Sequence, residues 1–288
     1  MGQHASVAYL PRLHAVVHGV EAATFSQARS AIDASLELLD PHIVVNRPST
    51  SSLAGTIRDG SALRSVWDRP GAWRDGQPLL DARQAVESLV AGRAEPARLG
   101  YGSLQLERTI ALPDGTRHAA PGIVTYGDVA LELDRAALES ASFTALDSLE
   151  LHTRLGGFRG PEPMGASDIA RPADLSAVMA DSLNAPLLQR LASVDDAADA
   201  AALLRDAWDA RQLARGSRGY VEVQLPDLDT ARISQVRIWP ASGMSGDGLA
   251  ALHGQAATDA ARAGVAEAAR ARNIPVVRVA AQLPDTPT

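Results

Sequence analysis

The stretch GYVEVQL at positions 219–225 places a glutamate between two valines. Side chains of a strand point alternately to its two faces, so the valines share one face and the other carries Tyr220, Glu222 and Gln224. Pro226 follows and cannot continue a hydrogen-bonded ladder. The pattern predicts a strand that ends before Pro226 and has one apolar and one polar face. A glutamate at such a position usually faces solvent, which is the ordinary interpretation of Glu222.

The rest of the chain predicts amphipathic helices and short strands. Helices are expected at 22–39, 79–92, 135–140 and 249–272, and another from the serines and threonine of 49–52 to Gly60. The region 172–215 is expected to be helical in two or three pieces, with one break at Pro186. Strands are expected at 42–47, 100–112, 123–134, 141–152, 219–225, 233–239 and 274–283. Strands do not alternate regularly with crossover helices, which predicts an α+β fold. We expect a helical segment at 1–40, a main domain at 41–282 and a loose tail at 283–288.

The composition excludes several classes of function. The 288 residues include no cysteine, which rules out disulfides, thiolate nucleophiles and cysteine-ligated zinc. Every basic residue is an arginine, and the net charge of −7 argues against nucleic-acid binding through a broad basic surface. No run reaches the ~18 apolar residues of a membrane-spanning helix, so we expect a soluble chain without a membrane partner. We expect it in the cytoplasm, or delivered by a specialised secretion route without a standard signal peptide.

Motifs of the common nucleotide-binding and hydrolase folds are absent. There is no Gly-x-Gly-x-x-Gly after a strand, no phosphate loop, no His-Glu-x-x-His and no Gly-x-Ser-x-Gly. His14 and His18 are spaced to share a helical face, but two histidines alone rarely bind a metal, and we expect no metal site. The remaining candidates lie on or beside the predicted strands: Arg47, Tyr101, Tyr126, Asp128, Ser142, Thr144, Asp147, Ser148 and Glu222.

The order of these residues along the chain resembles that in one known family. A series of sequence blocks is similar to the ADP-ribosyltransferase superfamily, in its uncharacterised toxin-like and phage-associated bacterial branches. In chain order these blocks are Arg47, IRDG with LRSVW, DARQAVES, GYGSL, YGDVALELD, SFTALDSL and GYVEVQL. The resemblance covers 41–239 and implies split antiparallel sheets around an NAD cleft with flanking helices. It also implies transfer of ADP-ribose from NAD to a protein or small-molecule acceptor, or hydrolysis of NAD.

The resemblance also implies roles for individual residues. Glu222 would be catalytic, because a carboxylate can stabilise the positive charge that develops on the ribose as nicotinamide leaves, and it would also hold the ribose 2′-hydroxyl. Arg47 would contact a phosphate or ribose oxygen of NAD, a task that suits a guanidinium. The other NAD contacts would come from Ser142, Thr144 and Tyr101, and those to the acceptor from Tyr220 and Gln224.

The sequence also departs from the family pattern. Many arginine-modifying members carry Gln-x-Glu or Glu-x-Glu, whereas here the order is Glu222-x-Gln224 with Tyr220 at the earlier position. The stretch TALDS lacks the glycine of the family's TFTxGDS, and Asn46 replaces the histidine that often precedes the arginine. The alternative is therefore a catalytically inactive binding or structural module of the same fold, associated with a phage or an effector.

Overall fold

A computed structural model shows a mixed fold of helices and a mainly antiparallel sheet, in agreement with the expected α+β class. The structure describes residues 7–63, 77–92, 98–111, 115–123, 126–153, 164–213, 220–226, 228–239 and 259–278. Seven strands follow the order β6-β7-β2-β1-β5-β8-β9, and β3 and β4 form a separate two-stranded ribbon. Their bounds are β1 His42–Arg47, β2 Gly100–Gln105, β3 Thr109–Ala111, β4 Arg117–Ala119, β5 Val129–Leu133, β6 Ser142–Thr144, β7 Glu222–Leu225, β8 Ile233–Ile238 and β9 Val276–Arg278.

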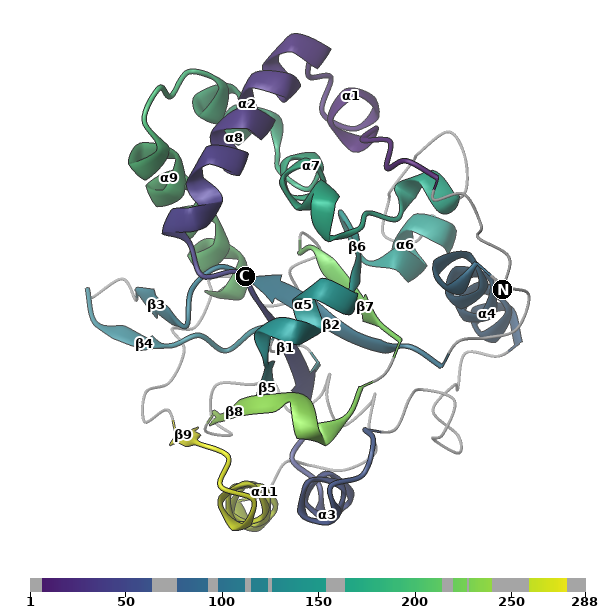
Figure 1. Cartoon of the computed structure of the whole chain (residues 1–288), viewed down its shortest axis with the longest axis vertical. Coiled ribbons are helices and arrows are strands. Elements are labelled where there is room, and N and C mark those ends of the chain that lie inside the picture. The colour runs from purple at the N-terminus through teal and green to yellow at the C-terminus, as the bar shows by residue number, and fades with distance from the viewer. Residues whose placement is uncertain are drawn as a thin grey trace, which may run out of the picture.

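Helices pack around this sheet in three groups (Figure 1). α2 packs against α7, α8 and α9 in the upper part of the view, α4 lies beside α6 near β6, and α3 pairs with α11 near β8 and β9. The bounds are α1 Leu13–Val16, α2 Ala22–Ser35, α3 Ser51–Asp59, α4 Gln77–Ala91, α5 Arg135–Ser140, α6 Ser148–Thr153, α7 Leu175–Asp181, α8 Ala185–Ala192, α9 Ala197–Leu213 and α11 Asp259–Ala271. Buried residues of α1 and α2 belong to the same hydrophobic cluster as those of the sheet.

The two faces of the sheet differ in polarity. Paired residues of neighbouring strands point to the same face, so one row contains Thr144, Glu222, Ser103, Val44, Glu132 and Gln235. The same alternation places the buried Phe143, Val223, Leu104, Ile43, Val45, Leu131 and Val236 on the opposite face. One face therefore carries the core, and the other is polar although most of its side chains are also buried.

Strand β1 changes its pairing partner halfway along its length. The first half of β1 pairs with β2, from His42 to Val44, and the second half pairs with β5, from Val44 to Arg47. The strands β6, β7 and β2 are thus joined to β5, β8 and β9 by a short shared region. Gly102 of β2 lies against this point, since a Cβ there would be 2.8 Å from the carbonyl oxygen of Val44.

Several expected elements are confirmed with their end signals. β1 covers the predicted 42–47, and β7 ends before Pro226. The Thr50 hydroxyl caps α3 by accepting from Leu53 N, and Gly60 ends that helix in the left-handed conformation. The predicted helical region 172–215 contains three α-helices, and Asp196 caps α9 by accepting from Ala198 N.

Other expectations are wrong in part. The predicted strand 141–152 ends at Thr144 and is followed by α6, because the Asp147 carboxylate accepts from Leu149 N and starts a helix. The predicted break at Pro186 lies a few residues earlier, between the end of α7 at Asp181 and the start of α8 at Ala185, and Pro186 itself is in the first turn of α8, where proline is tolerated. The predicted strand 100–112 divides into β2 and β3, which belong to different sheets.

Some predicted segments lie wholly or partly outside the described residues. They include LRSVW beyond Leu63, the first part of the helix 249–272, the end of the strand 274–283 and the tail 283–288. Within the described part of the chain, no helix combines the length and apolar character needed to cross a membrane.

Candidate active site on the polar face of the sheet

Five of the residues selected from the sequence lie on two adjacent rows of the polar face. Ser142 of β6 and Tyr101 of β2 both pair with Gln224, and Thr144 of β6 pairs with Glu222. Directly opposite residues on neighbouring strands have Cβ atoms roughly 5 Å apart. The fold therefore brings together three strands that are far apart in the sequence, and Glu222 lies on the middle strand of the three.

The carboxylate of Glu222 is held from several sides. Its side chain is buried, and the residue is only 3% exposed. Oε1 accepts from the Oγ and the backbone N of Ser148 at the start of α6, and from Gln224 Nε2 at 2.9 Å. Gln224 Nε2 also donates to Thr144 Oγ1 at 2.9 Å. These donors fix the orientation of Glu222 and favour its ionised form.

The protonation of Glu222 is balanced near neutral pH. Burial, followed by the charge of Asp147, raises the pKa of Glu222 to about 7. The charge of Arg83 and the hydrogen bonds from Ser148 and Gln224 oppose this increase. A perturbed carboxyl group among convergent polar side chains is typical of functional sites.

Two tyrosines and an aspartate lie beside Glu222. Tyr126 OH and Tyr220 OH each donate to Asp147 Oδ2 at 3.0 Å, and the two phenol oxygens are 2.9 Å apart. Burial, together with the charge of Asp147, raises the pKa of both phenols, so they remain protonated donors. Tyr126 is 38% exposed, whereas Tyr220 is buried, so the cluster extends from the site to the surface.

Helix α4 covers the Tyr101 end of the site. The guanidinium of Arg83 stacks over the Tyr101 ring, with Cζ 4.2 Å from the ring centroid. One turn later on α4, the buried Glu87 accepts from Tyr101 OH at 3.2 Å and from Arg98 N at 2.9 Å. Although burial opposes it, the pKa of Arg83 is raised by Tyr101, Glu222 and Asp147. Arg83 therefore stays positively charged, and its charge interacts with the carboxyl groups of Glu222 and Asp147.

The structure does not bring Arg47 into this group. Arg47 pairs with Val129 at the end of β1, and strand alternation places it on the face opposite Asn46. Asn46 is on the polar face, where its side chain donates to Pro121 O and Gly127 O and accepts from Ile123 N. The guanidinium of Arg47 donates instead to its neighbour's backbone, Asn46 O, at 3.1 Å.

Besides Tyr126, four residues of the site were not assigned a role from the sequence. Asp147 and Ser148 carry a visible signal, because they are polar residues directly after a strand. Arg83 and Glu87 are four positions apart in a helix, so they share a helical face, but a charged pair on a helix is usually solvated. Only their contacts with Tyr101 beneath α4 distinguish Arg83 and Glu87 from an ordinary solvated pair.

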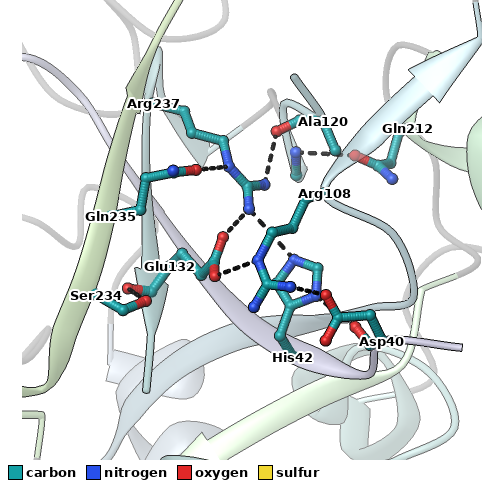
Figure 2. A network of polar contacts seen from close by, with 10 residues as sticks. Asp40, His42, Arg108, Ala120, Glu132, Gln212, Ser234, Gln235 and Arg237 are labelled. Carbon is teal, nitrogen blue, oxygen red and sulfur yellow. Dashed lines mark hydrogen bonds and ion pairs between the residues drawn. The ribbon is translucent and has the colours of Figure 1, made fainter. Parts of the chain in front are cut away.

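A second polar cluster on the same face contains a buried arginine (Figure 2). Arg237 of β8 is 0% exposed and donates to Gln235 Oε1 at 2.9 Å, to Ala120 O at 3.1 Å, to His42 Nε2 and to Glu132 Oε2. Glu132 also accepts from Arg108 Nε at 2.8 Å, and Arg108 pairs with Asp40. Although burial opposes it, the charge of Arg237 lowers the pKa of Glu132. These groups satisfy one another, which indicates a structural ion-pair network.

His42 within this network is neutral. Its Nδ1 lies 2.7 Å from Asp40 O and must donate to that carbonyl, which leaves Nε2 as the acceptor facing Arg237. Burial, followed by the charge of Arg237, lowers the pKa of His42 to about 4. Among the residues that the structure describes, no group of three or more histidine, aspartate or glutamate side chains is arranged to hold a metal ion.

Comparison with known proteins adds no family assignment. No protein-family model matches the chain, and no curated protein matches it.

Proposed function

We propose that this protein cleaves NAD between nicotinamide and ribose and transfers ADP-ribose to a protein or small-molecule acceptor, or to water. The observation that carries the proposal is the position of Glu222. It is buried and held by Ser148 and Gln224, on adjacent rows with Ser142, Thr144 and Tyr101. The sequence resemblance expects these same side chains around a catalytic glutamate.

The chemistry requires a fixed negative charge near the ribose. As the bond from ribose C1′ to nicotinamide breaks, its electron pair leaves with nicotinamide and positive charge develops on the ribose. An ionised Glu222 stabilises that charge. The acceptor then uses a lone pair to bond C1′ and releases its proton. Because the pKa of Glu222 is about 7, a large fraction is ionised at neutral pH, and any cation near it would increase that fraction.

The change of partner along β1 also supports the proposal. Because β1 pairs with β2 over one half and with β5 over the other, the sheet consists of two parts that meet near Val44. The split antiparallel sheets implied by the resemblance would have this form. The polar face that carries Glu222 is then the face on which an NAD cleft is expected.

The direct test is release of nicotinamide from NAD. We expect the wild-type protein to release nicotinamide and Glu222→Gln to lose about 100-fold or more of the rate, because it removes one main electrostatic stabiliser and keeps the side-chain shape. Glu139→Gln changes an exposed glutamate of α5 and serves as the matched control with unchanged rate. Equal rates in wild type and Glu222→Gln, both above the blank, would contradict the assignment of Glu222.

The alternative is a module of this fold that binds without chemistry. One observation favours it: Gln224 and Ser148 already occupy Oε1 of Glu222 with hydrogen bonds. Calorimetric titration with NAD separates the two candidates. Binding of NAD without release of nicotinamide, in the presence and absence of a cell lysate as the source of acceptors, would favour the binding module.

A further inference from the structure

Among the described residues, Arg237 and Arg211 have acceptors for their guanidinium groups, and Arg83 differs from them. Arg237 donates to four neighbouring residues, and Arg211 donates to the Oγ and backbone oxygen of Ser182. In the described part of the chain, Arg83 is the arginine whose Nε and Nη1 are shielded from solvent without a hydrogen-bond partner. A buried donor without an acceptor is costly, so such a group in a folded protein requires an explanation.

Arg83 is placed over the polar face and close to Glu222. Its guanidinium lies 4.2 Å above the centroid of the Tyr101 ring, an arrangement in which a cation is attracted to the ring face. Tyr101 pairs with Gln224 and Ser103 pairs with Glu222, so Tyr101 is a diagonal neighbour of Glu222, roughly 7–8 Å away. Arg83 therefore faces the same space as the candidate catalytic carboxylate.

The acidic groups of the site accept hydrogen bonds from donors other than Arg83. Glu222 accepts from Ser148 and Gln224, and Asp147 accepts from two tyrosines and from Leu149 N. Glu87 accepts from Tyr101 OH and Arg98 N. The cation is thus held among carboxylates that do not use its Nε and Nη1 donors, and these donors can serve a ligand.

We propose that Arg83 is the anion-binding residue of the polar face and that it binds an oxyanion of the substrate. Under the function proposed above, on which this assignment rests, the oxyanion is the diphosphate of NAD. A planar guanidinium held on an aromatic ring is well suited to phosphate oxygens. Helix α4 then supplies the positive charge that the sequence resemblance assigned to Arg47, a residue on the opposite face of the sheet.

The test is titration calorimetry of the full chain with inorganic diphosphate and, separately, with NAD. We expect wild type to bind both, and Arg83→Gln to weaken both by about tenfold or more, as for loss of a charged hydrogen bond. Arg58→Gln, at an exposed position of α3, is the matched control. Wild-type affinity in Arg83→Gln, no binding of diphosphate by wild type, or loss of affinity in Arg47→Gln instead would each overturn the proposal.

A second variant separates binding from folding. Arg83→Lys keeps a positive charge beside Glu222 and Asp147 but loses the planar, multi-donor group. We expect it to unfold within a few degrees of wild type and to bind diphosphate more weakly. If Arg83→Gln does not fold, this variant decides the question, and wild-type affinity in Arg83→Lys would overturn the role of the guanidinium.

The two proposals can fail separately. If diphosphate binds through Arg83 but NAD is neither bound nor cleaved, the anion site stands and the proposed function fails. If wild type and Arg83→Gln release nicotinamide with the same KM and kcat, the function stands and the assignment of Arg83 fails.

Discussion

Glu222 combines two properties that rarely occur together in a strand residue. It is almost fully buried, and the charges of a second carboxyl group, Asp147, and of a cation, Arg83, both act on it. Burial favours the protonated form, and the donors on Ser148 and Gln224 favour the ionised form. Its charge state therefore changes close to neutral pH, and stability should depend on it, as should activity under the function proposed above.

The stability of the protein should fall as Glu222 ionises. The folded-state pKa is about 7 and the ordinary value is 4.5, so between these values the folded state binds more protons than the unfolded state. Stability from this group is present below about pH 4.5 and is lost as the pH rises to about 7, by up to roughly 3 kcal/mol. Glu222→Gln cannot ionise, so its stability relative to wild type should increase from pH 4.5 to pH 7.

Chemical denaturation of both proteins across this pH range checks the prediction. The comparison needs the difference between the two unfolding free energies at each pH, because other groups titrate equally in both proteins. A difference that stays constant from pH 4.5 to pH 7 would mean that Glu222 keeps an ordinary pKa.

At the scale of elements, β2 is the strand that connects the candidate site to the centre of the sheet. It carries Tyr101 and Ser103 on the polar face, and Gly102 between them lies against β1 where that strand changes partner. A side chain at Gly102 would contact a backbone oxygen, Val44 O, which cannot rotate away. The close approach of β1 and β2 thus depends on this glycine.

Two glycine-to-alanine substitutions should therefore have opposite effects. Gly102→Ala places a Cβ 2.8 Å from Val44 O and should destabilise the protein by about 1–3 kcal/mol, as for other overpacked core positions. Gly55→Ala lies within α3 with no atom within 4 Å of the new Cβ, and should stabilise it by about 0.5–1 kcal/mol. Urea denaturation measures both, and equal shifts of the same sign would contradict the close packing.

The elements that sequence could predict are those with local signals. Alternation in GYVEVQL predicted β7, the β-branched run of HIVVNR predicted β1, and Thr50 and Gly60 predicted both ends of α3. The helix α6 was missed because its alternating apolar residues are typical of a strand. Its start depends on the Asp147 cap, and the Ser148 N–H and hydroxyl donate to Glu222, which lies far along the chain.

The candidate site, too, could be predicted only where the sequence carries a local signal. Period-2 alternation grouped Glu222 and Gln224 on one face, as the strand register shows, and Tyr220 precedes β7 with its hydroxyl bonded to Asp147. The register across β6, β7 and β2, which adds Ser142, Thr144 and Tyr101, is a property of the assembled sheet and has no local signal. For the same reason the sequence did not reveal Arg83, whose role depends on α4 packing over Tyr101.

At the scale of the whole molecule, one face of one sheet holds two charged clusters. Along the row that contains Glu222, Ser103, Val44 and Glu132, adjacent strands are about 4.8 Å apart, so the clusters are separated by roughly 14 Å. The cluster of Arg237 and Glu132 is saturated with internal hydrogen bonds, whereas that of Glu222 includes a cation with unused donors. We infer that the first cluster supports the fold and the second serves binding.

The structural role of the first cluster can be tested with a pair of variants. Arg237→Met leaves the buried Glu132 without its main partner and should cost about 3–5 kcal/mol of unfolding free energy. Adding Glu132→Leu removes the buried carboxylate that has then only Arg108 as a charged partner, so the double variant should recover a large part of that loss. Glu132→Leu alone should also destabilise the protein, because it leaves the buried Arg237 without its carboxylate partner.

His42 gives an independent readout of the same cluster. The charge of Arg237 is the second cause, after burial, of its low pKa, so Arg237→Met should raise the pKa of His42 above about 4. In wild type, stability from the neutral His42 is present above its ordinary value of 6.5 and is lost as the pH falls towards about 4. Titration of the histidine ring signals by NMR measures both proteins. An unchanged His42 pKa in Arg237→Met, or a double variant no more stable than Arg237→Met, would show that the ion pair does not hold this half of the sheet.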